Sequence, residues 1–95
     1  TTDIAYFQTS EKVNYIHTFD NNTYAIDQPL DEIEKTLDPK KFFRANRQFI
    51  VSAAAVEKIH FWFNSKLKVD LRPKSSEDVM ISREKAMAFR TWLGE

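Results

Sequence analysis

The segment KLKVDLR at residues 66–72 is the feature that most constrains the fold, because charged and apolar side chains alternate along its whole length. Successive side chains of a β-strand point to opposite faces, so this period of two predicts a strand with one buried face. The Asn64-Ser65 pair just before it predicts a tight hairpin turn, since asparagine tolerates positive φ. The aromatic run at residues 56–63 is then the partner strand of the hairpin.

Other short runs rich in β-branched and aromatic residues predict further strands, and polar turn-forming residues separate them. The chain has a single glycine, so its turns depend on asparagine, aspartate and serine. We therefore expect a strand-rich fold, with the additional strands at residues 4–8, 13–19, 23–26, 49–52 and 79–81.

Two segments show a helical period instead. In residues 29–37, three apolar residues fall on one face, acidic residues fill the other, and a proline stands at the start and again just beyond the end. Residues 82–95 predict a closing helix, with Ser82 as its N-cap and with Phe89 and Leu93 on its inward face. The acidic outer face of the first helix makes it unsuited to approach a nucleic acid, so we interpret this helix as structural.

Length and composition narrow the class of protein. The 95 residues suit a single domain, residues 1–95, and the chain has no cysteine for a disulfide, a thiol nucleophile or a thiolate metal site. No apolar run approaches the roughly 20 residues of a membrane span, and no signal pattern opens the chain, so we expect a cytoplasmic protein. Because the sequence begins Thr-Thr-Asp directly before an apolar stretch, we interpret it as a piece of a longer protein.

The net charge of zero conceals a division between the two parts of the chain. Residues 1–38 contain two basic and eight acidic residues, whereas residues 39–95 contain twelve basic and six acidic ones. The net charges are therefore −6 and +6. This asymmetry is compatible with a basic face directed at a polyanion and equally with an ordinary solvated surface.

The residues that most catalytic and metal sites require are largely missing. A single glycine excludes a glycine-rich phosphate loop. His17 and His60 each lie within a predicted strand, without a histidine, cysteine or carboxylate at ligand spacing, so we expect neither a metal site nor a catalytic triad. We therefore predict that the protein is not an enzyme and has no cofactor.

The segment FFRANRQFIVS, residues 42–52, places two arginines at the edge of a buried strand. If residues 44–48 bend into that strand, one arginine supports the fold and the other points outward. We expect Arg44 to pair with the acidic half and Arg47 to project beside Asn46 and Gln48. Arginine suits guanine edges and asparagine or glutamine suits adenine edges, and each good bidentate pair contributes about 1–3 kcal/mol of discrimination.

Arg83 directly follows the predicted cap, so it lies in the first turn of the closing helix. A cation there opposes the helix dipole and costs about 0.3–1 kcal/mol when exposed. A DNA phosphate or a guanine edge at the helix N-terminus would remove that conflict. The alternative is an ordinary surface arginine.

The segment FFRANRQFIVS resembles the F-x-R-x-H-R-S-x-x-V-N signature of the LytTR DNA-binding domain family. The segments IAYFQTSEKVNYIHTF, PLDEIEKTL and VMISRE resemble other parts of that family in the same order, so the resemblance spans nearly the whole chain. It implies a mainly β fold, an elongated stack of antiparallel sheets with short helices. It also implies sequence-specific binding of double-stranded DNA in transcription regulation, with loops inserted into the major grooves of paired direct repeats.

Three positions match the base-contacting loops of the family: Asn14, Arg47 and Arg83. Three others depart from its usual residues, because Asn46 stands for histidine, Gln48 for serine and Ser52 for asparagine. These departures predict a different sequence preference. We further expect a set of residues to contact phosphates or to support the loops, namely Lys12, Lys41, Asn46, Gln48, Arg72, Lys74 and Lys85.

The resemblance also implies partners beyond DNA. Such domains commonly follow a receiver domain in response regulators of two-component systems. The isolated domain is then expected to be a monomer that dimerises on DNA, with no membrane association.

Two other classes of function remain open. One is a protein-interaction module that uses the aromatic segment HFWF, residues 60–63, as a partner surface. The other is a small-ligand-binding β domain, which would have a concave pocket with convergent polar groups.

Overall fold

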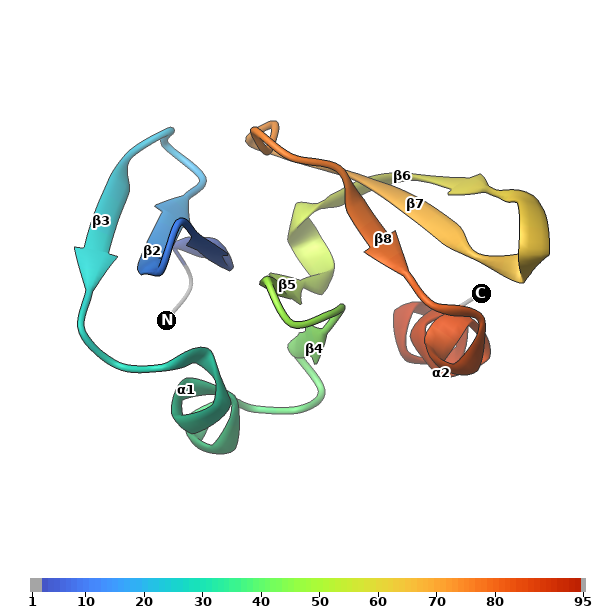
Figure 1. Ribbon diagram of the computed structural model, residues 1–95, viewed down its shortest axis with the longest axis horizontal. Helices are drawn as coiled ribbons and strands as arrows, with labels where there is room; N and C mark the ends of the chain where they lie inside the picture. Colours follow the sequence, from blue (N-terminus) through green and yellow to red (C-terminus); the bar gives the residue numbers. More distant parts are fainter. Residues whose placement is uncertain (1–2, 95) are drawn as a thin grey trace.

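A computed structural model describes residues 3–94 of the chain. It contains two antiparallel sheets and short helices, so the predicted mainly β fold is confirmed. Its principal extents are 34 × 26 × 24 Å, and the long axis runs from the strand β3 (Thr23–Ile26) to the turn between the strands β6 (Val56–Phe61) and β7 (Leu67–Leu71) (Figure 1). The elements in chain order are β1 (Ile4–Ser10), β2 (Val13–Thr18), β3 (Thr23–Ile26), α1 (Leu30–Thr36), β4 (Phe42–Arg44), β5 (Phe49–Ser52), β6 (Val56–Phe61), β7 (Leu67–Leu71), β8 (Val79–Ile81) and α2 (Arg83–Leu93).

The strands form a first sheet with the order β3-β2-β1-β5-β4 and a second sheet with the order β6-β7-β8. All neighbouring strands in both sheets are antiparallel. In the part of the chain that the structure describes, neither helix is long and apolar enough to cross a membrane.

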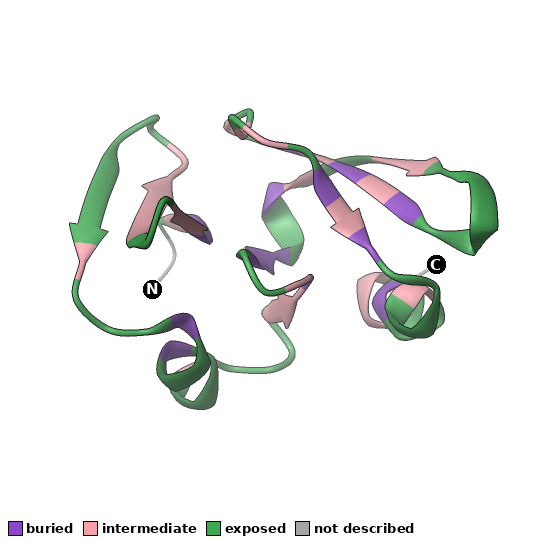
Figure 2. Ribbon diagram, viewed as in Figure 1, coloured by how far each residue is buried: buried purple, intermediate pink, exposed green. Residues whose placement is uncertain are grey.

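The central strands β1 and β5 are buried on both faces. Tyr6 and Phe49 face a core shared with β7, β8 and α2, whereas Phe7 and Ile50 face a second core under α1. This arrangement follows from the alternation of side chains along a strand, because adjacent residues enter opposite layers. Figure 2 shows the outcome: β5 and the sheet-facing side of α1 are buried, while β3 and the outer side of α1 are exposed.

The structure differs from the predictions at two turns and at one helix cap. The strand expected at residues 56–63 ends at Phe61, because residues 62–66 form a wider turn in which the Trp62 N–H donates to the Lys66 carbonyl. Asn64 and Ser65 do adopt positive φ, as the turn prediction requires. Ser82 occupies the N-cap position of α2, but its hydroxyl makes no capping hydrogen bond.

The second of these turns joins β1 to β2. Ser10 pairs with Val13, which leaves Glu11 and Lys12 alone to reverse the chain, at φ values of 50° and 67°. Two-residue hairpin turns with positive φ normally use asparagine or glycine, so this dipeptide did not indicate that the connection expected between residues 8 and 13 is a two-residue turn.

His17 is a half-buried strand histidine, stacked on Tyr6 with ring centroids 4.5 Å apart. Its Nε2 lies 2.9 Å from the side-chain oxygen of Gln8, and its Nδ1 lies 3.2 Å from the Thr23 hydroxyl. Burial lowers the pKa of His17 from its usual 6.5 and raises the pKa of Tyr6 to about 12. The folded state therefore favours the neutral ring.

We predict that replacing Glu11-Lys12 by Asn-Gly raises the free energy of unfolding by about 1 kcal/mol, because both new residues tolerate positive φ. Urea denaturation measures the change. The same dipeptide placed at Glu57-Lys58, inside β6, is the control and should destabilise the protein. An unchanged or lower unfolding free energy for the Asn-Gly turn variant would show that the native turn carries no strain.

A second prediction concerns pH. Because the pKa of His17 is lowered on folding, the unfolded state binds this proton first as the pH falls below about 6.5. The free energy of unfolding should then decrease between pH 7 and pH 5 by more in the wild type than in His17→Gln. Denaturant titrations at both pH values measure this difference, and equal decreases would contradict the assignment.

Candidate nucleic-acid interface

Several polar segments meet at one end of the first sheet. The pairing of Ser10 with Val13 places the β1–β2 turn there, and the pairing of Arg44 with Ile50 places the loop between β4 and β5 at the same end. We call this loop, residues 45–48, the 45–48 loop. It contains Asn46, Arg47 and Gln48.

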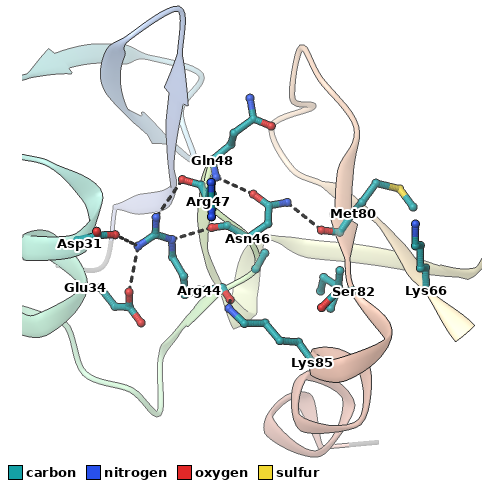
Figure 3. A pocket seen from close by; sticks show the side chains of 12 residues that line it. Asp31, Glu34, Arg44, Asn46, Arg47, Gln48, Lys66, Met80, Ser82 and Lys85 are labelled. Atoms are coloured by element: carbon teal, nitrogen blue, oxygen red, sulfur yellow. Dashed lines mark hydrogen bonds and ion pairs between the residues drawn. The ribbon is translucent and has the colours of Figure 1, made fainter.

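Arg44 holds the 45–48 loop against α1 (Figure 3). Its Nε donates to the carbonyl of Asn46 at 2.7 Å, and its Nη2 donates to the carbonyl of Arg47 at 2.9 Å. Its Nη1 contacts Asp31 at 2.9 Å and Glu34 at 3.0 Å. The expectation that Arg44 pairs with the acidic half is confirmed, and its carbonyl contacts also set the path of the loop.

Asn46 ties the 45–48 loop to the second sheet. Its side-chain oxygen accepts the N–H groups of Gln48 and Phe49, at 2.7 and 3.1 Å. Its side-chain nitrogen donates to the carbonyl of Met80 on β8 at 2.8 Å. These contacts occupy the amide inside the protein, so Asn46 acts as a support for the loop.

Two further side chains fix the surroundings of the loop. Gln48 donates to Glu77 at 3.1 Å, and the other carboxylate oxygen of Glu77 accepts the hydroxyl of Ser10. Lys85 reaches from α2 to donate to the carbonyl of Arg44 at 3.1 Å. The loop is therefore attached to α1 through Arg44, to β8 and to the segment before β8, and α2 holds the residue directly before it.

Arg47 is the exception within the loop. Its backbone carbonyl is held by Arg44, but its exposed guanidinium has no hydrogen bond or ion pair among residues 3–94. Figure 3 shows Arg47 between Arg44 and Gln48, on the loop that separates α1 from β8. A fixed backbone thus carries a free cationic side chain.

Three hollows adjoin one another, since neighbouring ones share lining residues, and we call them together the groove. The largest, of about 800 Å³, is lined by Arg47, Lys66 and Lys85. Arg47 also lines a hollow of about 540 Å³ together with Asn14, and Lys66 also lines a hollow of about 470 Å³ together with Arg83. The groove therefore runs past the three positions predicted to contact bases, with Arg47 in its middle.

The two end positions differ in how free their side chains are. Asn14 lies on β2, where its side-chain oxygen accepts the Thr9 hydroxyl at 2.6 Å and its nitrogen donates to the carbonyl of Gln28 at 2.8 Å. Arg83 is the first residue of α2, its side chain is 70% exposed, and its ion pair with Glu84 spans 4.0 Å. The side chain of Asn14 keeps one N–H for a further hydrogen bond. The guanidinium of Arg83, apart from its long ion pair with Glu84, is available for contacts with a ligand.

The predicted supporting cations divide into two groups. Lys12 lies in the β1–β2 turn at the groove end of the sheet, and Lys85 lines the groove. Lys41, Arg72 and Lys74 line none of the three hollows. Arg72 lies over the ring of Phe19, Lys74 lines a separate polar hollow, and Lys41 lies at the opposite end of the first sheet.

Lys66 is a groove residue that was not predicted from the sequence. It is exposed, it connects two of the three hollows, and it has no ion pair among the described residues. The only signal in the sequence is its place as the first charged residue after the Asn64-Ser65 turn.

The aromatic segment beside this end of the groove is exposed. Phe61 is 69% exposed, Trp62 44% and Phe63 70%, and Met87 of α2 is also exposed. Phe61 and Trp62 line the same hollow as Arg83. The structure thus places apolar surface directly beside a candidate nucleic-acid contact.

One histidine–carboxylate pair lies outside the groove. His60 and Asp70 on neighbouring strands of the second sheet are 2.7 Å apart, and this hydrogen bond lowers the pKa of Asp70. Within residues 3–94 there is no group of three or more histidine, cysteine or carboxylate side chains that could hold a metal ion.

Comparison with known proteins gives consistent results. The sequence model of the LytTr DNA-binding domain matches residues 1–94. The chain is 32% identical over 93 residues to the sensory transduction protein LytT of Bacillus subtilis, a match that covers 98% of this chain and 37% of LytT. It is 34% identical over 56 residues to the transcriptional regulatory protein LytR of Staphylococcus aureus strain N315, covering 59% of this chain and 22% of LytR.

A solved structure is similar over nearly the whole chain. The LytTr DNA-binding domain of a putative methyl-accepting/DNA response regulator from Bacillus cereus superimposes with a TM-score of 0.80 at 26% identity. The match covers 98% of this chain and 83% of that one. The present chain thus spans well under half the length of the curated relatives named above.

We predict that Arg44→Met lowers the free energy of unfolding by about 2–4 kcal/mol, because two carbonyls and two carboxylates lose their donor. Arg47→Met is the matched control and should change it by less than about 0.5 kcal/mol, since this side chain is exposed and unpaired. Denaturant unfolding of both variants measures the contrast. Equal losses would mean that Arg44 does not hold the loop.

Proposed function

Because the chain belongs to the LytTr DNA-binding domain family, we propose that it binds double-stranded DNA in a sequence-specific manner and so regulates transcription. The observation that carries the proposal is the free guanidinium of Arg47 on a loop whose backbone and neighbouring side chains are fixed by hydrogen bonds. The groove that runs from Asn14 to Arg83 is the surface that would face the DNA.

Base recognition would depend on the rigidity of the 45–48 loop. A bidentate contact from Arg47 to a guanine contributes about 1–3 kcal/mol of discrimination. The loop backbone loses little further freedom on binding, because Arg44 and Asn46 already fix it before DNA arrives. Asn14 and Arg83, at the two ends of the groove, would contact bases on either side, either to recognise them or to orient the protein on the DNA.

Phosphate attraction would come mainly from the cations near the groove. Lys66 and Lys85 line the groove, and Lys12 lies in the turn at its end. The helix α2 begins at Arg83, and its free N-terminal backbone amides suit an anion. Asp31 and Glu34 also line the groove, but Arg44 pairs with both and reduces their repulsion of phosphates. For Lys41, Arg72 and Lys74, phosphate contact stays a prediction from the sequence.

The finer features of the proposal come from the family resemblance. We expect the loops to enter the major grooves of paired direct repeats, and we expect a monomer in isolation that dimerises on DNA. The relatives are a sensory transduction protein and a transcriptional regulatory protein, and the chain matches only part of each. A receiver domain preceding this domain in a cytoplasmic response regulator is therefore the expected context.

A protein-interaction surface is the second candidate function. It is favoured by the exposure of Phe61 and Phe63, which lie at one end of the molecule. If this were the main function, replacing both residues by serine would abolish binding of the partner protein. DNA binding would either not occur in the wild type or be the same in the variant.

We predict that Arg47→Ala reduces the preference for a selected operator over a scrambled duplex by about 5-fold to 100-fold, because a base contact is lost. The operator is first selected from a random pool of duplexes. Fluorescence anisotropy then measures the affinity of each variant for both duplexes. Equal weakening on both would show that Arg47 contacts only the backbone.

Lys66→Ala is the complementary variant. It should weaken binding to both duplexes alike and reduce the slope of log K against log salt by about 0.9, the value for one lost phosphate contact. The same titrations repeated at several salt concentrations measure the slope. An unchanged slope would remove Lys66 from the interface.

A further inference from the structure

A second concave surface lies away from the groove, at the other end of the first sheet. Phe42 pairs with Ser52 at this end of β4 and β5, whereas the pairing of Arg44 with Ile50 leads into the 45–48 loop at the opposite end. Here the structure has a cleft of about 500 Å³ under the C-terminal end of α1. Of the residues predicted to contact DNA, only Lys41 lines this cleft, and it lines none of the three hollows of the groove.

The walls of the cleft are mainly apolar. Ile4 and Phe42 line it from the first sheet, Leu37 from the end of α1, and Phe19 from the segment after β2. A volume in the range of small-molecule sites, about 300–1,000 Å³, together with apolar walls, is what an organic ligand of modest size requires.

Ser52 gives the cleft an unsatisfied polar group. The residue is only 7% exposed, and its hydroxyl is the one buried side-chain polar atom among residues 3–94 without a hydrogen-bond partner. Side chains alternate along β5, so Ser52 shares a face with Ile50, which packs in the core under α1. The hydroxyl therefore lies on the face of the sheet where the cleft opens. Buried polar groups are normally paired, so this one lacks a partner that a ligand can supply.

The charged groups at the cleft favour an anion. Lys40 and Lys41 line it, both exposed, and neither forms an ion pair within the described part of the chain. Asp38 is the one carboxylate of the lining, and its side-chain oxygen accepts the backbone N–H of Lys40 at 2.9 Å. Lys41 is also a neighbour of Ser52, because the N–H of Ala53 donates to the Lys41 carbonyl at 3.1 Å. A cation and a hydroxyl donor can thus converge on one small anionic group.

We propose that this cleft binds a small amphiphilic carboxylate. The apolar body of the ligand lies against Ile4, Leu37 and Phe42. Its carboxylate accepts a hydrogen bond from the Ser52 hydroxyl and pairs with the ammonium of Lys41. Lys40 adds a second positive charge at the mouth of the cleft.

The inference stands apart from the proposed DNA function, because it uses residues at the opposite end of the sheet. It gives Lys41 a role that does not require DNA. It also explains why the Ser52 hydroxyl has no hydrogen-bond partner within the described part of the protein.

The test is a titration of the isotopically labelled protein with decanoate and with phenylbutyrate, each below its aggregation limit, followed by nuclear magnetic resonance. We expect saturable shifts confined to residues 36–42 and 52–54, with a dissociation constant on the order of 1 mM or tighter for ligands of this size. Decanol is the uncharged comparison and should bind with no dependence on Lys41. The proposal would be overturned if neither carboxylate produced saturable shifts, or if the shifts were centred on the exposed residues 61–63.

Ser52→Ala separates a ligand contact from a structural role. Removal of an unpaired buried hydroxyl should leave the thermal midpoint unchanged or raise it, while carboxylate affinity falls by about tenfold. Lys41→Gln should weaken carboxylate binding and leave decanol binding unchanged. Lys35→Gln, on α1 but outside the lining of the cleft, is the matched control and should have no effect. Undiminished carboxylate binding by both Ser52→Ala and Lys41→Gln would overturn the assignment.

Discussion

The guanidinium of Arg44 is the contact on which the groove depends. It is only 14% exposed, and its donors reach two backbone carbonyls of the 45–48 loop and two carboxylates of α1. A planar group with several donors in fixed directions can make this set of contacts, and a lysine ammonium cannot. The acidic part of the chain therefore supports the cationic part. The opposed charges of the two parts meet at one partly buried side chain, which explains how an acidic helix can border a surface suited to DNA.

Much of the fold could be predicted because its signals are local. The alternation in residues 66–72 identified β7, and the helical periods of residues 29–37 and 82–95 identified α1 and α2. The pairing of Arg44 with acidic residues followed from charge alone. A connection between residues 8 and 13 was expected from the polar residues there. Its two-residue form could not be predicted, because Glu11 and Lys12 adopt positive φ only under the constraint of the paired strands on either side.

The site was less accessible to sequence reasoning, because its geometry comes from contacts between distant residues. Asn46 suggested a base contact by its residue type, yet its amide is occupied by Met80, which lies 34 positions away in the sequence. Lys66 enters the groove because the β6–β7 hairpin packs beside α2, and no local pattern indicates that packing. The resemblance of the motifs to a family indicated Asn14, Arg47 and Arg83 in advance, and the structure places all three along one groove.

The pairing of β1 with β5 has a kinetic consequence. These strands lie side by side at the centre of the first sheet, yet β2, β3, α1 and β4 separate them along the chain. Closing so long a loop costs chain entropy before either core can form, and a fold with many such distant pairings forms slowly for its size. The hairpins at the two ends can form early, but neither layer is complete until β5 inserts beside β1. Folding should therefore be a single cooperative event limited by the docking of this central strand.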